Sequence, residues 1–251
     1  MPAGSRDAWP EDYERGRPGY PREAVDVAGV PADATVLDLG AGTGKLTRRL
    51  LEAFARVVAV EPSEPMRSVL RRTCPTAAAL DGSAEQIPVP GFSVDAVFAA
   101  ECFHWFDGPR ALAEIARVLR PGGALVLLWN LPAGPTEPSL EAVEELLAPY
   151  WPPPETIGSS LGDLAAARFS SGDWRRPFTG SRFGELRETQ LPNAQTVDRD
   201  GLVAFFASMG WIADLADEER LPLLERVRAR LDHAEYRRPW QTHVHWTRLD
   251  R

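Results

Sequence analysis

Apolar and polar positions alternate in blocks along residues 33–130 of this chain. Five short, nearly continuous apolar runs predict buried strands at Thr35–Leu39, Val57–Glu61, Thr76–Asp81, Ala96–Ala100 and Ala124–Asn130. The segments between them carry apolar residues at helical spacing and predict helices at Lys45–Ala53, Pro65–Arg72 and Pro109–Leu119. A proline and two glycines in Arg120–Gly123 then end the third helix. This alternation predicts an α/β fold with a parallel sheet covered by helices on both faces.

The regular alternation stops after residue 130, where the chain becomes rich in Pro, Gly, Ser and Trp. We interpret residues of about 135–180 as a lid insert that contains one helix at Ser139–Leu147. Periodic order then returns and predicts a strand near Gly184–Leu191, helices at Arg199–Ser208 and Glu218–Asp232, and a strand at Thr242–Leu249. Residues 1–32 lack a core period and form an N-terminal arm, so we expect one domain over residues 33–251, with the helices of 199–232 completing the lid.

Composition narrows the classes of partner. The net charge is −8, which argues against a general electrostatic attraction to nucleic acid or to an anionic membrane. Cys74 and Cys102 lie far apart, match no metal-binding spacing and are typical of free thiols in a reducing compartment. No apolar run approaches the length of a transmembrane helix or of a signal-peptide core. We therefore expect a cytoplasmic protein with no metal, no nucleic-acid partner and no membrane partner.

The first predicted strand runs into a glycine-rich turn that bares the backbone for a ligand. Gly40, Gly42 and Gly44 stand at alternate positions before a predicted helix, so amide N–H groups converge on one spot. A dinucleotide fingerprint would need its third glycine at Lys45, and a phosphate-binding Walker loop would need Ser or Thr at Leu46. The pattern therefore fits neither of these nucleotide-binding motifs.

Two further segments suit the nucleoside part of a ligand. Glu61 ends the second strand 21 positions after Gly40, where a carboxylate accepts hydrogen bonds from both hydroxyls of a ribose. Met66, which follows Glu61-Pro62 by one helical turn, can lie against an adenine face. In the loop after strand three, the Ala84 N–H and Glu85 can read the adenine edge. The alternative for that loop is a helix N-cap at Ser83 with a capping box completed by Gln86.

The end of strand four faces the reacting groups, because ligands bind outside the carboxyl ends of parallel strands. The sequence there is Ala-Ala-Glu-Cys-Phe-His-Trp-Phe-Asp from residue 99, with apolar and aromatic walls that suit a sulfonium cation. His104 is the candidate general base. The alternative is a packed, hydrogen-bonded histidine with a structural role.

Together these motifs resemble the class I S-adenosylmethionine (SAM)-dependent methyltransferases. The resemblance rests on Asp38-x-Gly-x-Gly-x-Gly44, the Gly82-to-Pro88 segment, the His104-Trp105-Phe106 stretch and the arm from Tyr13 to Pro21, and it is nearest to the UbiE-like, methyltransferase domain 11 group. It implies a Rossmann-like, doubly wound sheet of seven strands in the order 3-2-1-4-5-7-6, with the last strand antiparallel. It also implies SAM as cofactor, S-adenosylhomocysteine (SAH) as product and a small-molecule acceptor, methylated by in-line displacement.

The resemblance assigns roles to individual residues. Arg17 would pair with the methionine carboxylate of the cofactor, and Tyr13 would close over the methyl group. The cofactor-binding residues it implies are Tyr13, Arg17, Asp38, Gly40, Ala41, Gly42, Thr43, Gly44, Glu61, Pro62, Met66, Ala84, Glu85, Ala100 and Glu101. His104 would be catalytic, and the expected acceptor-binding aromatic residues are Trp105, Trp151, Trp174 and Trp211, with Phe169 and Phe178 beside them.

Three other functions remain compatible with parts of the sequence. A non-catalytic SAM- or SAH-binding protein would keep the glycine loop and Glu61. An NAD-dependent oxidoreductase would share the sheet and the acidic residue, but it lacks support from the glycine spacing. A nucleic-acid methyltransferase would be expected to carry an Asn/Asp-Pro-Pro-Tyr motif after strand four and a basic surface. This sequence has no such motif there, and its net charge is −8. The sequence does not identify the acceptor, the atom methylated or the oligomeric state.

Overall fold

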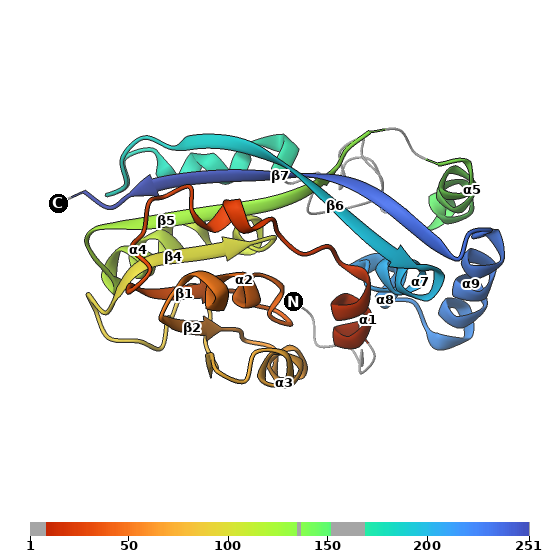
Figure 1. Cartoon of the computed structure of the whole chain (residues 1–251), viewed down its shortest axis with the longest axis horizontal. Coiled ribbons are helices and arrows are strands. Elements are labelled where there is room, and N and C mark those ends of the chain that lie inside the picture. Colours follow the sequence, from red (N-terminus) through yellow and green to blue (C-terminus); the bar gives the residue numbers. More distant parts are fainter. Residues whose placement is uncertain (1–8, 135–136, 152–168, 251) are drawn as a thin grey trace.

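A seven-stranded sheet forms the centre of the computed structural model, which describes residues 9–134, 137–151 and 169–250 (Figure 1). The strand order is β3-β2-β1-β4-β5-β7-β6. Strands β1 to β5 pair in parallel, whereas β7 is antiparallel to both β5 and β6. The predicted fold class, the strand order and the antiparallel last strand are therefore confirmed.

From β1 to α4 the bounds of the elements agree with the predicted ones to within two residues. The strands are β1 Thr35–Leu39, β2 Arg56–Val60, β3 Ala78–Leu80, β4 Val94–Ala100, β5 Leu119–Pro132, β6 Arg187–Asp198 and β7 Glu235–Arg248. The helices are α1 Trp9–Gly16, α2 Lys45–Ala53, α3 Glu64–Thr73, α4 Gly108–Val118, α5 Pro138–Leu147, α7 Arg199–Ala207, α8 Gly210–Ala213 and α9 Asp217–Arg230. Short 3-10 turns add η1 Arg22–Val25, η2 Phe103–Trp105, η3 Ala148–Tyr150 and η4 Asp173–Phe178.

Alternate side chains of each central strand enter two separate cores, because successive residues of a strand point to opposite faces. On one face, Val36 and Phe98 pack with Leu50 of α2 and with η1. On the other face, Leu37 and Val97 pack with α4 and η4. This two-sided burial explains why the strands are apolar at nearly every position.

Three strands are longer than the sequence pattern predicts. β5 begins directly after α4, since Leu119 pairs with Val94 before the register shifts and Ala124 pairs with Ala96. β6 and β7 form one long antiparallel pair that passes through Pro192 and Pro239. The predicted β6 stopped at Leu191, before Pro192, and the predicted β7 began at Thr242, after Pro239. Proline is tolerated in β6 because β6 is an edge strand, where a missing N–H leaves no ladder bond unmade.

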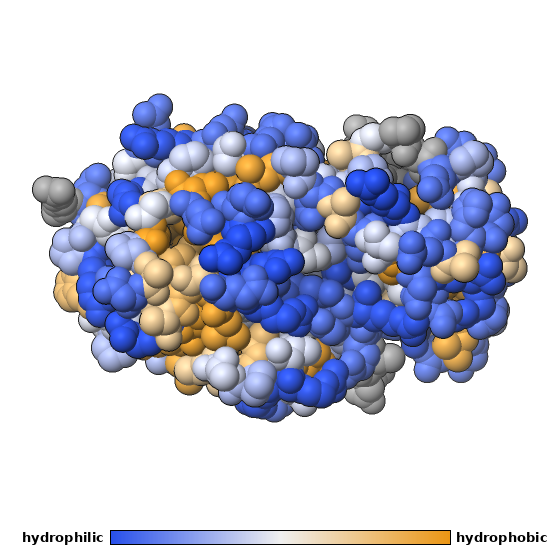
Figure 2. All heavy atoms as spheres, viewed as in Figure 1, coloured by the Kyte–Doolittle hydropathy of each residue, from blue (hydrophilic) through white to orange (hydrophobic). Residues whose placement is uncertain are grey.

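The β6–β7 pair extends past the rest of the sheet to a helical cap, formed by α5, α7, α8 and α9 (Figure 1). The cap has its own apolar core, which includes Phe205 and Phe206 of α7 and Trp240 of β7. Its outer surface is mostly hydrophilic, whereas apolar residues gather over β1 and β2 in the same view (Figure 2). The predicted helices of 199–232 therefore correspond to α7 and α9, with the short α8 between them.

Helix α1 connects the sheet part of the molecule with the helical cap, and the sequence pattern did not predict this helix. Glu14 of α1 accepts from Lys45 and Arg48 at the start of α2. On its other side α1 packs against α7, where a Cβ on Gly16 would lie 2.1 Å from the Phe205 nitrogen. The segment we took for an arm without regular structure is thus a helix held by ion pairs and by one close backbone contact.

Two global features complete the description. In the parts of the chain that the structure covers, no helix has the length and apolar character needed to cross a bilayer. Within the same parts, no three His, Cys, Asp or Glu side chains come together as metal ligands. Residues 135–136 and 152–168 of the predicted lid insert lie outside the described residues.

Candidate functional site

The glycine turn brings bare backbone to the carboxyl ends of β1 and β2. Gly40, Gly42 and Gly44 have positive φ angles of 71°, 57° and 94°. A Cβ on Gly40 would lie 2.9 Å from Cys102 Sγ, and one on Gly44 would lie 2.7 Å from Cys74 Sγ. Nothing lies within 4 Å of the Cβ position at Gly42, so this residue borders open space. The turn therefore needs glycine for its conformation at all three positions and leaves room for a ligand at the middle one.

Glu61 lies against this turn and is held by backbone amides. Gly42 N donates to Glu61 Oε2 and Ser63 N donates to Oε1, each at 2.9 Å. Burial raises the pKa of the Glu61 carboxyl, and the two amide bonds oppose that rise. A carboxylate has about four acceptor positions, so Glu61 can still accept from two further hydroxyl groups.

Asp38 and Thr43 carry buried oxygen atoms that no described group satisfies. Thr47 Oγ1 donates to Asp38 Oδ2 at 2.6 Å, whereas Asp38 Oδ1 and Thr43 Oγ1 have no hydrogen-bond partner among the described residues. Burial raises the pKa of Asp38 to about 7, against the lowering effect of Thr47. Because unsatisfied buried polar atoms are costly, both atoms indicate a missing polar ligand at this turn.

The loop after β3 contains no helix, so the proposed N-cap at Ser83 is wrong; the chain bends back, and Ser83 pairs with Gln86 in an isolated bridge. Ala84 and Met66 are buried. Glu85 Oε1 accepts from Asp107 N at 3.0 Å and so ties this loop to the start of α4.

The end of β4 adds a third carboxyl group. Glu101 has a φ of 56°, an unusual backbone conformation for a residue with a side chain, and its Oε1 accepts from Asn130 N at 2.5 Å. Loss of contact with water raises the pKa of the Cys102 thiol well above its usual range, and the nearby carboxyl groups of Asp38, Glu61 and Glu101 add to this rise. Three acidic side chains thus surround one point at the edge of the sheet.

His104 lies in η2, directly beyond β4. The fully buried Trp129 of β5 donates from Nε1 to His104 Nδ1 at 3.0 Å. Since the indole N–H can only donate, Nδ1 must accept, and a neutral His104 carries its proton on Nε2. Such an imidazole presents a donor and not a lone pair, so this geometry does not favour the base role expected from the sequence.

The arm residues lie beside α7. Arg17 Nε donates to Ser208 Oγ at 2.9 Å, and its guanidinium lies 5.6 Å from the Tyr13 ring centroid and 4.9 Å from that of Phe205. Tyr13 and Arg17 are therefore neighbours. The side chain of Arg17 contacts the cap, through α7 and the residue that follows it.

The aromatic residues expected around the acceptor do not form one group. Trp174 is buried in the sheet core, 4.7 Å from Trp129 between ring centroids, with Phe169 and Phe178 packed on the same core. Trp151 and Trp211 pack on the core of the cap. Trp105 is 47% exposed beside His104. Trp105 therefore lies directly beside His104, whereas the other three tryptophans are divided between two cores, so the four do not share one wall.

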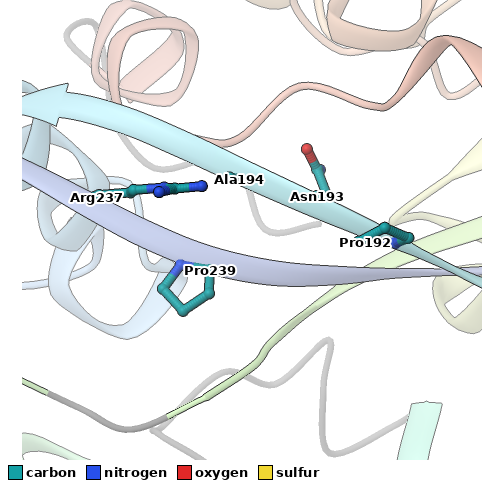
Figure 3. Close-up of a pocket in the computed structure, with 5 residues that line it drawn as sticks. All are labelled: Pro192, Asn193, Ala194, Arg237 and Pro239. Atoms are coloured by element: carbon teal, nitrogen blue, oxygen red, sulfur yellow. The ribbon is translucent and has the colours of Figure 1, made fainter.

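Sequence reasoning overlooked several side chains of this edge. Trp129 and Asn130, the partners of His104 and Glu101, stand at the carboxyl end of β5, a position that could have marked them. Tyr20 is buried near Glu101, and its pKa is raised well above the usual range, chiefly by burial. A hollow of about 380 Å³ lies on the β6–β7 pair, beside Pro192, Arg237 and Pro239 (Figure 3).

The arrangement suits a ligand that combines paired hydroxyls with positive charge. Glu61 can accept from the hydroxyls, and the bare Gly42 backbone allows close approach. Asp38 and Glu101 supply negative potential in a buried setting, where charges interact more strongly than in water.

The comparisons with known proteins point to one kind of family. A family model described as a methyltransferase domain matches residues 37–127. An uncharacterized methyltransferase of Mycobacterium tuberculosis is 58% identical over 118 residues, or 47% of this chain, and the match spans about half of that relative, 49%. An uncharacterized methyltransferase-like protein of Schizosaccharomyces pombe is 35% identical over 226 residues, which cover 88% of this chain and 82% of the relative.

Solved structures show the same fold. A candidate type II methyltransferase from Anaeromyxobacter dehalogenans superposes with a TM-score of 0.65 at 26% identity, over 93% of this chain and 97% of that one. A SAM-dependent methyltransferase from Aquifex aeolicus superposes with a TM-score of 0.50 at 21% identity, over 71% of this chain and 90% of that one.

Proposed function

This chain belongs to the SAM-dependent methyltransferase family, and from that premise we propose that it methylates a small-molecule acceptor. The cofactor supplies an electrophilic methyl group on a sulfonium sulfur, which a nucleophilic O, N, S or C atom of the acceptor displaces in line. The contribution of the protein is positioning, exclusion of water and electrostatic stabilisation. The net charge of −8 supports a small molecule over a nucleic acid as acceptor.

The observation that carries this proposal is the contact between the glycine turn and Glu61. The Gly42 amide fixes one carboxylate oxygen of Glu61 at 2.9 Å, and the turn itself is open at Gly42. Glu61 would hold the ribose hydroxyls, and Met66 and Ala84 would border the adenine. The unsatisfied oxygens of Asp38 and Thr43 fit the polar methionine end of the cofactor.

The remaining site residues would orient the reacting groups. Asp38 and Glu101 favour a positively charged ligand at the edge of β1 and β4. His104, fixed by Trp129, would donate from Nε2 to an acceptor oxygen or nitrogen and hold it in line. In this proposal His104 positions the acceptor and does not abstract its proton. The arm, with Tyr13 and Arg17, limits the access of water to the site from the side of the cap.

Calorimetric titration tests the proposal. SAH and SAM should bind the purified chain, and NAD⁺ should not. Glu61→Ala should weaken SAH binding by roughly tenfold to a thousandfold, because it removes charge-assisted bonds to two hydroxyls.

The matched control is Glu64→Ala, which removes an exposed carboxylate paired with Arg67 and Arg71. This variant should leave SAH affinity within about a factor of two, since exposed ion pairs contribute little. Equal affinity of the Glu61→Ala and Glu64→Ala variants for SAH would refute the assignment of Glu61. Binding of NAD⁺ in place of SAH would refute the proposed function.

A further inference from the structure

A narrow pocket opens inside the cap, between β7 and α7, and the roles assigned so far do not use it. Its polar wall consists of Arg238 and Trp240 of β7 with Glu144 of α5. Its apolar wall includes Phe205, Met209 and Leu140. The volume is about 20 Å³, about the space of one water molecule, so the pocket has room for a small polar head group and not for a ring.

The polar wall is built from donors that suit an anion. Trp240 is 97% buried, at 3% relative exposure, and its Nε1 has no hydrogen-bond acceptor among the described residues. The guanidinium of Arg238 lies 3.9 Å from the Phe205 ring centroid and 4.6 Å from that of Trp240. Two aromatic rings thus fix the plane of the guanidinium, which is the arrangement that recognises a planar carboxylate.

Glu144 does not contradict an anionic occupant. Burial and the neighbouring Glu141 raise the pKa of Glu144, whereas Arg238 lowers it. In its protonated form Glu144 is a further donor on the pocket wall.

The pocket lies next to the arm that we place over the cofactor. The Phe205 ring, which the Arg238 guanidinium contacts, is also contacted by Arg17. The Arg17 guanidinium lies 4.9 Å from the Phe205 ring centroid. Arg17 is in turn fixed by Ser208, one residue beyond α7. An acceptor anchored at Arg238 would therefore extend from the cap toward the side on which the arm meets the glycine turn.

We infer that this pocket binds the carboxylate of the acceptor, which is a small organic acid. This inference rests on the proposed function, because it names the acceptor class of the same enzyme. The carboxylate serves as the anchor, received by the Arg238 guanidinium and the Trp240 N–H, and the rest of the acid carries the atom to be methylated.

The inference is tested with paired probes that differ only in charge. Benzoate and hexanoate, each beside its neutral amide, are titrated by calorimetry into the full chain saturated with SAH. Each acid should bind at least about tenfold more tightly than its amide, because only the acid supplies anionic oxygens to the guanidinium. Equal binding of acid and amide, or binding of neither, would overturn the inference.

Variants locate the effect. Arg238→Met keeps the length of the side chain and should abolish the preference for acid, and Trp240→Phe keeps the ring and should reduce acid affinity about threefold to tenfold. The matched control is Arg237→Met, since Arg237 directly precedes Arg238 in the same strand, is exposed and borders the separate hollow on the β6–β7 pair (Figure 3). Arg237→Met should leave acid binding unchanged, and a loss equal to that of Arg238→Met would reject the pocket.

The readouts separate this inference from the proposed function. SAH affinity is measured for every variant and should not change, because none of the three residues belongs to the proposed cofactor site. If SAH does not bind the unaltered chain, the proposed function fails, and the acid and amide titrations are repeated without it to judge the pocket alone. If circular dichroism shows that Arg238→Met is unfolded, Trp240→Phe decides the outcome.

Discussion

At the scale of single residues, the buried acid at the end of β1 has the largest consequence. Asp38 is 1% exposed, receives one hydrogen bond from Thr47 and has a pKa raised to about 7 by burial. Between a pH of about 4 and about 7, the ligand-free protein therefore holds a proton on Asp38 that the unfolded chain has already given up near the usual pKa of 3.8. A group with a raised carboxyl pKa destabilises the fold as pH rises, because the unfolded state ionises first.

We therefore expect a pH-dependent stability that Asp38→Asn removes. Below a pH of about 4 the burial of Asp38 does not lower the unfolding free energy. The loss of unfolding free energy grows as pH rises and is complete above about pH 7. It amounts to a few kcal/mol at about 1.4 kcal/mol per pKa unit. Urea denaturation of the ligand-free chain between pH 5 and 8 should show that the unfolding free energy of the Asp38→Asn variant increases relative to that of the unaltered protein as pH rises. The exposed Asp26→Asn is the control, and parallel curves for Asp38→Asn and the unaltered chain would contradict the assignment.

The tautomer of His104 is a second property of a single residue. The bond from Trp129 predicts, at pH 7, a proton on Nε2 and a lone pair on Nδ1. Long-range ¹H–¹⁵N NMR distinguishes the two nitrogens, and His104→Gln identifies the signal among the four histidines. Trp129→Phe should remove the bias toward this tautomer. A proton found on Nδ1 in the unaltered chain would return His104 to the role of a base.

The sequence predicted the glycine turn and the presence of His104, because both depend on neighbours in the chain. It could not predict which nitrogen of His104 accepts, since Trp129 lies 25 positions away on another strand. The same reason applies to Glu101, whose carboxylate is bound by the Asn130 amide. Assigning the chemistry of these side chains required the pairing of β4 with β5.

At the scale of elements, helix α1 shows where periodicity fails. It spans only eight residues, Trp9–Gly16, too short to show an apolar stripe, and it is held by contacts to segments far along the chain. Trp9 donates to the carbonyl of Ser208, and Gln195 donates to that of Gly16. Helix α1 is thus stabilised by contacts with the cap and with α2, and a pattern of neighbouring residues gives no sign of such distant contacts.

Gly16 permits the close contact between α1 and α7, so Gly16→Ala should disrupt it. The added Cβ would meet the Phe205 backbone at 2.1 Å, and backbone cannot move as a flexible side chain does. We expect a loss of about 1–3 kcal/mol in unfolding free energy and weaker SAH binding, measured by denaturation and calorimetry. Gly19→Ala is the control, because nothing lies within 4 Å of its Cβ position. If both variants behave alike, the α1–α7 contact does not hold the arm.

At the scale of the whole molecule, the chain consists of a sheet with nearly local connections and a cap reached by long strands. The order 3-2-1-4-5-7-6 was predictable once the motifs of the first five strands indicated the family. The extent of β6 and β7 was not, because Pro192, Pro239 and polar alternation give a weak strand signal. The distribution of Trp151, Trp174 and Trp211 between two cores was equally hidden, since all three are apolar residues that either core could bury.

The position of α1 between these two parts leads to a prediction about the ligand-bound molecule. Glu11 and Glu14 tie α1 to α3 and α2, while Arg15 and Trp9 tie it to the cap. A cofactor held by the glycine turn and by Arg17 would therefore strengthen both sets of contacts at once. Hydrogen exchange should slow in α1 and α7 when SAH binds, as well as in the glycine turn.

Adenosine separates the two halves of this effect, because it has the ribose and adenine of SAH without the methionine part. It should slow exchange at the glycine turn and at the end of β2 near Glu61, and leave α1 and α7 unchanged. SAH protection confined to the turn would mean that Arg17 does not reach the ligand and that the arm closes on something else. Protection of α1 by adenosine as well would mean that the arm responds to the nucleoside, and the pairing of Arg17 with the methionine carboxylate would then be abandoned.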